Sequence, residues 1–168
     1  MNRDNPFEVL SRRGLVEWCS APEELSQLFA SEMVTGYVGF DPSADSLHVG
    51  NMVPIMGLAW LQRLGHRPLA IVGGGTGLIG DPSGKSKERP LLTHDQVVHN
   101  MECIREQLSL FLDFDRTPNG AVILNNYDWL KDQSLIGFLR DTAKFFTVNY
   151  MISREYVRSR LEDPEKSI

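Results

Sequence analysis

Cysteine is scarce in this sequence of 168 residues: Cys19 and Cys103 lie far apart, and neither has a partner motif around it. Two such cysteines do not make a metal site and are typical of a protein in a reducing compartment. Long apolar stretches are lacking too, because no window approaches the ~18 uninterrupted apolar residues that a membrane span needs. The amino-terminal segment MNRDNPFEVL has no apolar core, so it does not predict a signal peptide. We therefore expect a cytoplasmic protein with no membrane partner.

Positive charge does not dominate, since 17 Lys and Arg residues are set against 22 Asp and Glu residues and the formal net charge is -5. The chain as a whole is not expected to attract nucleic acid, so any RNA contact would need a local basic patch. Arg154, Arg158 and Arg160 form the one mild candidate, with a solvated helix face as the simpler interpretation. The sequence also has no HExxH, GxSxG, cysteine cluster or acidic triad. It therefore predicts neither a covalent nucleophile nor a metal held by the protein.

The composition is that of an ordinary globular domain, with 42% hydrophobic residues, and the pattern alternates between strands and helices. Strands are expected at Val34–Phe40, Leu69–Val72 and Ala121–Leu124. Helices are expected at Phe7–Arg13, Glu23–Ser31, His48–Leu64, His94–Phe111, Gln133–Phe146 and Ser153–Glu162. This order predicts an α/β fold, a Rossmann-like, doubly wound parallel sheet with helices on both faces. We expect a helical segment at residues 1–32 and a single α/β domain at residues 33–168.

Three of these elements carry finer signals. Thr93 and Gln96 stand three apart before a helical run, which predicts a capping box at its start. In the helix that begins near His48, one face gathers apolar side chains at helical spacing, namely Val49, Met52, Val53, Met56, Trp60 and Leu64. The strand at Leu69–Val72 (LAIV) is wholly apolar, as expected of a central parallel strand covered on both faces.

Ligands of such sheets bind beyond the carboxyl ends of the strands. Three loops leave those ends and hold nearly all the unusual chemistry: residues 39–51, 73–89 and 125–129. In the first, His48 and Asn51 stand three apart in the first turn of a helix, so both could point into one pocket. Gly50 between them would let a flat group lie against the backbone, and a helix N-terminus suits phosphate. A second interpretation stays open, in which His48 only caps the helix and Gly50 only packs.

The second loop has six glycines in its first twelve residues, a backbone suited to close approach by a ligand. Lys85, Lys87 and Arg89 then add positive charge that suits a polyphosphate. GDPSGKS falls one spacer short of a P-loop, and Pro90 follows where a helix should run, so we reject a P-loop. A flexible surface loop is the alternative. The third loop carries the further candidate site residues Asn126, Asp128 and Trp129. The alternative interpretation is that the first two form a turn and that Trp129 belongs to the core.

Together these segments resemble one family. GFDPSADSLHVGN is similar to the ATP signature of class I aminoacyl-tRNA synthetases, the His-Ile-Gly-His motif. GHRPLAIVGGGTGLIGDPSGKSKER resembles the loop of bacterial tyrosyl-tRNA synthetases, and ILNNYDWL and FFTVNYMISREYVRSRL match the same family further on. Their occurrence in this order is far more specific than any one segment. The resemblance runs from about Arg13 to the last residue, and Tyr37 together with GLIGDPSGK separates it from the tryptophan enzyme.

The resemblance implies a tyrosine–tRNA ligase. Such an enzyme activates L-tyrosine with ATP, accompanied by Mg²⁺, to tyrosyl-adenylate and then transfers the tyrosyl group to tRNA(Tyr). No general base is needed, because a carboxylate is already a nucleophile and the enzyme has only to position the reactants and stabilise charge. Members of the family are homodimers, which makes Phe145 and Phe146 candidate dimer contacts. A core position for both phenylalanines is the alternative.

The residue roles implied by the resemblance follow the matched motifs. The tyrosine-binding positions are Tyr37, Thr76, Asp81 and Asn126. Of these, Tyr37 would contact the phenol of the substrate and Asp81 its ammonium group. The ATP-binding positions are Gly39, Asp41, His48, Gly50 and Asn51. The catalytic positions, which meet the γ-phosphate, the ribose or the departing pyrophosphate, are Ser43, His48, Asn51, Lys85 and Arg89.

The family pattern is departed from at Asn51, Val38 and Pro54 and in length, and Pro54 is expected only to stiffen the start of its helix. Asn51 replaces the second histidine of the motif, and its amide can still donate to a ribose oxygen, so we expect function to be kept. Val38 stands where many members have cysteine, so one ribose contact is expected to be lost. The family's tyrosine-binding helix, ribose-binding segment and mobile Lys-Met-Ser-Lys-Ser loop do not follow, so we expect a truncated domain, a fragment with little or no aminoacylation alone. Two alternatives stay open: a stand-alone nucleotide- or tyrosine-binding module, and another class I nucleotidyl transferase such as the tryptophan enzyme.

Overall fold

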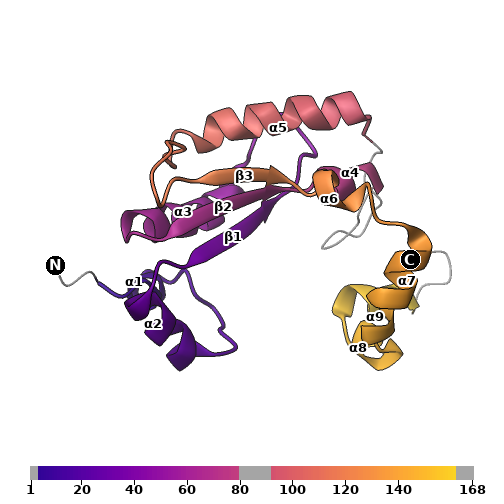
Figure 1. Cartoon of the computed structure of the whole chain (residues 1–168), viewed down its shortest axis with the longest axis horizontal. Coiled ribbons are helices and arrows are strands. Elements are labelled where there is room, and N and C mark those ends of the chain that lie inside the picture. The colour runs from indigo at the N-terminus through magenta and orange to yellow at the C-terminus, as the bar shows by residue number, and fades with distance from the viewer. Residues whose placement is uncertain (1–3, 80–91, 162–168) are drawn as a thin grey trace.

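The structure is a computed structural model, and it describes residues 4–79 and 92–161. The elements in chain order, drawn in Figure 1, are α1 (Pro6–Arg12), α2 (Pro22–Ser31), β1 (Thr35–Phe40), the 3-10 turn η1 (Val49–Asn51), α3 (Met52–Arg63), β2 (Arg67–Val72), α4 (Gly74–Ile79), α5 (His94–Leu108), β3 (Val122–Asn125), α6 (Tyr127–Leu130), α7 (Leu135–Asp141), the 3-10 turn η2 (Ala143–Phe145), α8 (Val148–Ile152) and α9 (Glu155–Leu161). None of the helices in this described part is long and apolar enough to cross a membrane.

The described strands form one parallel sheet in the order β1-β2-β3, which confirms the predicted α/β fold. The register places Tyr37 beside Leu69 and Leu69 beside Val122. Because strands that follow each other in sequence are neighbours in the sheet, the chain winds in a single direction. Right-handed crossovers then carry α3 and α5 to the same face of the sheet. Figure 1 shows α5 running along that side.

The core lies between this face and the two helices. Alternate residues of β1 and β2 point into it, since Phe40, Ala70 and Val72 are all buried. They join one cluster with residues of α3 and α5, among them Ile55, Leu58, Ala59, Ile104 and Leu108. The opposite face is different: Tyr37 is 70% exposed, and Leu69 and Ile71 are only half-buried. In the described part, helix packing is therefore concentrated on one face, because a doubly wound sheet gains its second layer only where the strand order reverses.

The boundaries of the first helices follow from their caps. Asn5 accepts a hydrogen bond from the Phe7 N–H at 2.9 Å, and Pro6 occupies the first turn, where its missing N–H costs nothing. Gly14 follows with a φ of +70°, a conformation that suits glycine at the end of a helix. The capping box predicted for α5 is confirmed: Gln96 N–H donates to Thr93 Oγ1 at 3.3 Å, and Thr93 N–H donates to Gln96 Oε1 at 2.9 Å.

The predicted apolar stripe of α3 is wrong. The helix buries Ile55, Leu58, Ala59 and Leu61, whereas Val49, at the head of the expected stripe, is 86% exposed. The segment MVPIMGLAWLQR is apolar on nearly every side, so spacing alone does not select the face that packs. The packing face is set by contact with the sheet. A Cβ on Gly36 would lie 2.7 Å from Leu61 Cδ2, so the glycine leaves room for the leucine to pack against β1.

Two other predictions need correction. Residues 74–79, expected to belong to a loop, form α4, and the single helix expected at 133–146 is α7 followed by η2. The short helix α8 was not predicted. Its start is marked by Thr147, whose hydroxyl accepts from the Tyr150 N–H at 3.2 Å, as Ser134 accepts from the Gly137 N–H at 3.0 Å before α7. Closely spaced caps of this kind divide the region into short helices.

Candidate site at the carboxyl ends of the strands

The carboxyl ends of the three strands bring distant segments to one edge of the sheet. The Gly73 N–H donates to the Phe40 carbonyl at 2.9 Å, and the Asn126 N–H donates to the Val72 carbonyl at 3.0 Å. These bonds extend the strand pairing by one residue on each side of β2. Pro42 lies against α4, since its Cγ is 3.5 Å from where a Cβ on Gly77 would be. The three predicted loops therefore meet where ligands of parallel sheets bind.

Asn126 and Thr76, both predicted tyrosine-binding residues, are brought together at this edge. Asn126 Oδ1 accepts from the Gly75 N–H at 2.7 Å, and Asn126 Nδ2 donates to Thr76 Oγ1 at 3.3 Å. The Thr76 hydroxyl in turn donates to the Gly73 carbonyl at 3.1 Å. Each polar group of the Asn126 amide is therefore used, and the turn between β2 and α4 is fixed to the end of β3.

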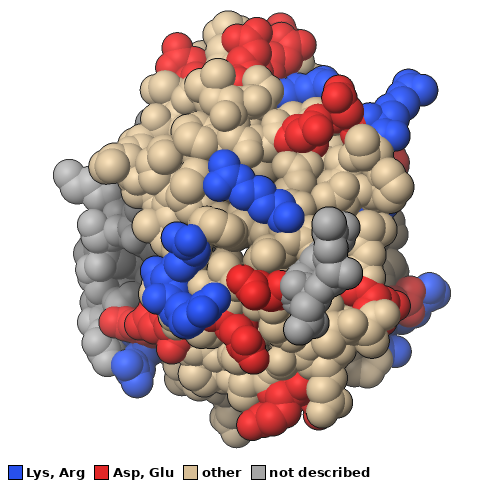
Figure 2. All heavy atoms as spheres, turned by 90° about the vertical axis from the view of Figure 1, so that its left-hand side faces the viewer, with Lys and Arg blue, Asp and Glu red and all other residues tan. Residues whose placement is uncertain are grey.

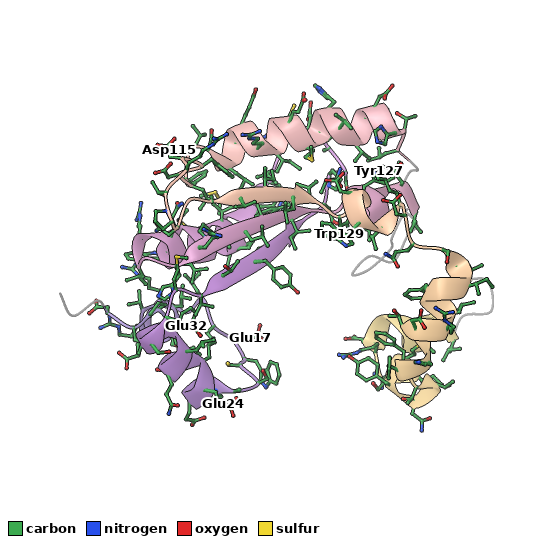
Figure 3. All side chains as sticks on the ribbon, viewed as in Figure 1. Glu17, Glu24, Glu32, Asp115, Tyr127 and Trp129 are labelled. Carbon is green, nitrogen blue, oxygen red and sulfur yellow. The ribbon has the colours of Figure 1, made fainter. Side chains whose placement is uncertain are left out.

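Asn125 is a residue of this edge that the sequence analysis did not single out. It is buried, and its Oδ1 accepts from the Tyr127 N–H at 3.0 Å at the start of α6. A Cβ on Gly74 would overlap the Asn125 amide, so the glycine is required by this close approach. A buried amide directly after an apolar strand is the signal that could have identified it. Figure 3 shows Tyr127 and Trp129 at this end of the sheet and Asp115 at the other.

Trp129 is not the core tryptophan that one interpretation of the third loop required. Its side chain is 43% exposed on α6. The four-residue helix places it at the surface of the same edge that carries Asn126.

The first loop ends in a reciprocal cap formed by His48 and Asn51. The His48 N–H donates to Asn51 Oδ1 at 3.0 Å, and His48 Nδ1 accepts from the Gly50 N–H at 3.0 Å. The capping interpretation thus describes this structure, and the flat group that lies against Gly50 is the imidazole itself. A Cβ on Gly50 would be 2.8 Å from His48 Cε1. Because Nδ1 accepts, the neutral ring carries its proton on Nε2, which leaves that nitrogen as a donor on an exposed side chain.

The other predicted residues of the described part lie on β1 and in the loop that follows it. Tyr37 and Gly39 alternate along β1 and share the exposed face of the sheet. Asp41 follows β1, with Oδ1 3.6 Å from where a Cβ on Gly73 would be, and Ser43 is exposed two residues further on. Tyr37 stands three residues before the end of β1, roughly 10 Å along the strand from Phe40. Asp81, Lys85 and Arg89 lie outside the described residues.

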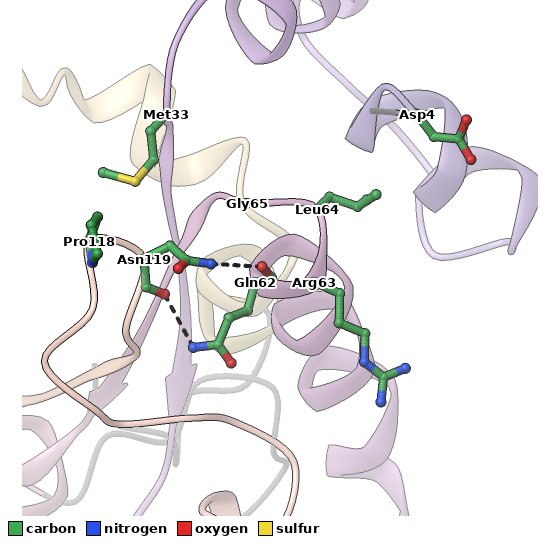
Figure 4. Close-up of a pocket in the computed structure, with 8 residues that line it drawn as sticks. All are labelled: Asp4, Met33, Gln62, Arg63, Leu64, Gly65, Pro118 and Asn119. Atoms are coloured by element: carbon green, nitrogen blue, oxygen red, sulfur yellow. Dashed lines mark hydrogen bonds between the residues drawn. The ribbon is translucent and has the colours of Figure 1, made fainter. Parts of the chain in front are cut away.

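A pocket of ≈ 580 Å³ lies at the opposite, amino ends of the strands (Figure 4). Gln62 occupies one wall: its Nε2 donates to the Asn119 carbonyl at 3.2 Å, and Asn119 Nδ2 donates to the Gln62 carbonyl at 2.9 Å. Arg67 Nε likewise donates to the Pro118 carbonyl at 3.1 Å. These polar groups hold the turn before β3 against α3, so we assign this pocket a structural role.

Two basic side chains near these amino ends stack on a tryptophan of the same chain. Figure 2 shows Lys and Arg gathered near the middle of this face, with acidic side chains above and below. The Arg13 guanidinium lies 3.7 Å from the centre of the Trp60 ring, and the Arg63 guanidinium lies 5.5 Å from it. Such stacking is a common use of arginine beside tryptophan and needs no nucleic acid.

The described residues offer no protein cage for a metal ion. Nowhere in 4–79 or 92–161 do three His, Cys, Asp or Glu side chains gather closely enough to hold one. Mg²⁺ is commonly held through one or two carboxylates together with substrate phosphates. Asp41 brings one carboxylate to the carboxyl edge of the sheet. A single carboxylate fits an Mg²⁺ ion that is held mainly by the phosphates of a substrate.

Comparison with known proteins identifies the family. A model described as tRNA synthetases class I (W and Y) matches residues 30–168. The chain belongs to this class I synthetase family. Within the family it is similar to the tyrosine–tRNA ligase of Roseiflexus castenholzii, at 54% identity over 155 residues, which are 92% of this chain and 36% of the relative. The tyrosine–tRNA ligase of Desulfatibacillum aliphaticivorans is 53% identical over 161 residues, 96% of this chain and 37% of the relative.

This class I synthetase chain therefore spans little more than a third of the length of those relatives. A solved structure agrees with the fold. The C-terminally truncated mitochondrial tyrosyl-tRNA synthetase of Aspergillus nidulans superposes with a TM-score of 0.81 and 26% identity, over 99% of this chain and 49% of that one. The resemblance to tyrosyl-tRNA synthetases and the predicted Rossmann-like fold are both confirmed.

Proposed function

We propose that this chain forms the amino-terminal part of the catalytic domain of a tyrosine–tRNA ligase. In the proposed reaction a carboxylate oxygen of L-tyrosine forms a bond to the α-phosphorus of ATP. The bond from that phosphorus to the bridging oxygen breaks, and pyrophosphate leaves with the electron pair. A hydroxyl oxygen at the terminus of tRNA(Tyr) then forms a bond to the tyrosyl carbonyl carbon, the bond from that carbon to the phosphate oxygen breaks, and AMP leaves with the electron pair. Mg²⁺ would come with the phosphates of ATP and neutralise part of their charge.

The observation that carries the proposal is the meeting of Asp41, Thr76 and Asn126 at the carboxyl edge. These residues come from the three predicted loops, and their family counterparts face the two substrates of one reaction: Asp41 the nucleotide, and Thr76 and Asn126 the tyrosine. Thr76 and Asn126 hold each other through the 3.3 Å contact, which would give the tyrosine site a fixed wall. Reactions that depend on positioning need such fixed walls, because a small misplacement of the reacting atoms slows them greatly.

The strand β1 and the loop that follows it would take different parts of the substrates. Tyr37 would meet the tyrosine phenol, with Asp81 at its ammonium. Gly39 and Asp41 would face the nucleotide, and Ser43 would accompany His48 at the γ-phosphate. His48 is suited to this role because the Gly50 N–H occupies Nδ1 and leaves the Nε2 proton for an anionic oxygen.

Four further positions complete the proposed site. Asn51 and Gly50 would lie beside the ribose, and Lys85 and Arg89 would hold the departing pyrophosphate. Positive charge there would stabilise the leaving group as its charge develops.

The wider organisation is also a proposal. We divide the chain into a helical segment, residues 1–32, and the first part of the catalytic domain, residues 33–168, and we place the enzyme in the cytoplasm with the translation machinery. A homodimer is supported by the apolar side chains exposed on α7, η2 and α8, among them Leu135, Ile136, Phe138, Phe145 and Val148. Phe145 is 75% exposed, which argues against a core position within this chain.

The proposal can be tested in a hybrid ligase. The segment of the Roseiflexus castenholzii enzyme that matches this chain is replaced by the chain, and exchange of labelled pyrophosphate into ATP is measured. We expect exchange that depends on tyrosine and is not supported by tryptophan. A folded hybrid with no exchange, or one that prefers tryptophan, would overturn the proposal.

A further inference from the structure

Two side-chain amides on α5 hold the backbone of the loop between β1 and η1. Asn100 Nδ2 donates to the Pro42 carbonyl at 2.8 Å, and only 8% of Asn100 is exposed. Gln107 Oε1 accepts from the Leu47 N–H at 2.9 Å, and Gln107 Nε2 donates to the Asp45 carbonyl at 3.0 Å. The loop belongs to no helix or strand, so these three bonds attach it to a rigid element.

The geometry of the helix sets the spacing of this attachment. Asn100 and Gln107 are seven residues apart, so they lie on one side of α5, roughly 10 Å apart along its axis. One amide holds the start of the loop and the other holds its end. Gln107 bonds to residues 45 and 47 as a neighbouring strand would, because its amide offers a donor and an acceptor in one plane.

The held segment carries the residues that the proposed function assigns to the γ-phosphate. Ser43 directly follows Pro42, and His48 directly follows Leu47. Resting on that proposed function, we propose that Asn100 and Gln107 are positioning residues, which fix Ser43 and His48 for a nucleoside triphosphate without touching it. Stabilisation of phosphate charge depends on donors that are held in place before the charge develops.

Gln107 is the better residue to change, because it is half-buried and the chain should fold without its amide. Gln107→Met keeps the length of the side chain and removes both bonds to the loop, together with the bond from Nε2 to the Cys103 carbonyl within α5. Gln107→Glu keeps an acceptor for the Leu47 N–H and loses the donor to Asp45. Glu106→Gln, at an exposed position one residue away on α5, is the matched control.

The first readout is hydrogen exchange at the Leu47 amide, followed by NMR in the 168-residue chain. We expect Gln107→Met to speed exchange at this amide at least about fivefold, the loss of a bond worth ~1 kcal/mol. Gln107→Glu should restore most of the protection, and Glu106→Gln should leave it unchanged. Equal exchange in the wild type and in Gln107→Met would overturn the proposal.

The second readout compares binding of Mg·ATP and of AMP, which lacks the β- and γ-phosphates. We expect Gln107→Met to weaken binding of Mg·ATP by about 3- to 10-fold, the effect of one or two lost bonds, and to leave AMP unchanged. An equal loss for both nucleotides would mean a merely structural role and would overturn the inference alone. A wild-type chain that binds neither nucleotide would count against the proposed ATP site and, with it, the inference.

Discussion

Asn126 and Thr76 lie fifty residues apart in the sequence and meet at the carboxyl edge of the sheet, with Asn126 Nδ2 3.3 Å from Thr76 Oγ1. The same amide accepts from the Gly75 N–H at 2.7 Å, so one side chain joins the end of β3 to the start of α4. The amide offers, on two separate atoms, the donor and the acceptor that these two contacts need. The contact links two of the proposed substrate-binding residues directly.

Asn126→Ala should therefore destabilise the chain. The change leaves the partly buried Gly75 N–H without its acceptor and removes the donor to the Thr76 hydroxyl, which should lower the free energy of unfolding by ~1–3 kcal/mol. Urea denaturation followed by circular dichroism measures it. Asn149→Ala, at an exposed position on α8, is the control, and equal stability of the two variants would show that the Asn126 contacts contribute nothing.

Two glycines should respond to alanine in opposite directions. A Cβ on Gly74 would overlap the Asn125 amide, so Gly74→Ala should cost ~1–3 kcal/mol, as overpacking usually does. A Cβ on Gly57 would meet nothing within 4 Å in the interior of α3, so Gly57→Ala should stabilise by ~0.4–1 kcal/mol. Melting temperatures of both variants decide the matter. A Gly74→Ala chain that melts with or above the wild type would contradict the packing described here.

The tautomer of His48 is a third expectation. Because Nδ1 accepts from the Gly50 N–H, the neutral ring should carry its proton on Nε2. Correlation of the ring nitrogens with the ring protons by NMR, in chain labelled at histidine, identifies the tautomer. Gly50→Ala should remove the preference, since its Cβ would come within 2.8 Å of His48 Cε1. A proton found on Nδ1 in the wild type would exclude the proposed donor.

If the proposed dimer forms through the helices α7 and α8, a charged substitution there should lower the average mass of the hybrid ligase in solution. If the exposed apolar side chains of α7, η2 and α8 form the interface, Phe145→Glu should weaken self-association at least about tenfold, since burial of one charge there costs more than 1.4 kcal/mol. Sedimentation equilibrium of the hybrid ligase measures it. Val49→Glu, at a residue that is also largely exposed but lies far from α7 in sequence, should leave the dimer intact. Dissociation by both variants, or by neither, would place the interface elsewhere.

Much of the fold could be predicted because its signals are local. The capping box of Thr93 and Gln96 and the apolar strand of β2 each lie within a few neighbouring residues. The buried face of α3 could not be predicted, because the helix is apolar on nearly every side and β1 selects Leu61. Helix α7 and the turn η2 were predicted as one helix, because the apolar pattern continues across the break between them, and α8 was not predicted.

For the site too, features with a local signal could be predicted and features set by distant contacts could not. The three loops were predicted from strand ends, and the meeting of Thr76 with Asn126 follows from parallel topology together with the resemblance. The hydrogen bonds from Asn100 and Gln107 to the loop after β1 join positions about sixty residues apart. A pattern of neighbouring residues therefore does not predict them. The cap between His48 and Asn51 was weighed as an alternative, because spacing alone does not say whether a histidine turns toward a ligand or toward its own helix.

The central claim, that tyrosine is the activated substrate and Tyr37 contacts its phenol, is tested most directly by pyrophosphate exchange in the hybrid ligase. Rates with tyrosine and with phenylalanine are compared before and after Tyr37→Phe. The variant should lower kcat/KM for tyrosine by about 2- to 10-fold, the value of one hydrogen bond, and leave the rate with phenylalanine unchanged. An equal fall for both amino acids, or no change for either, would contradict the account.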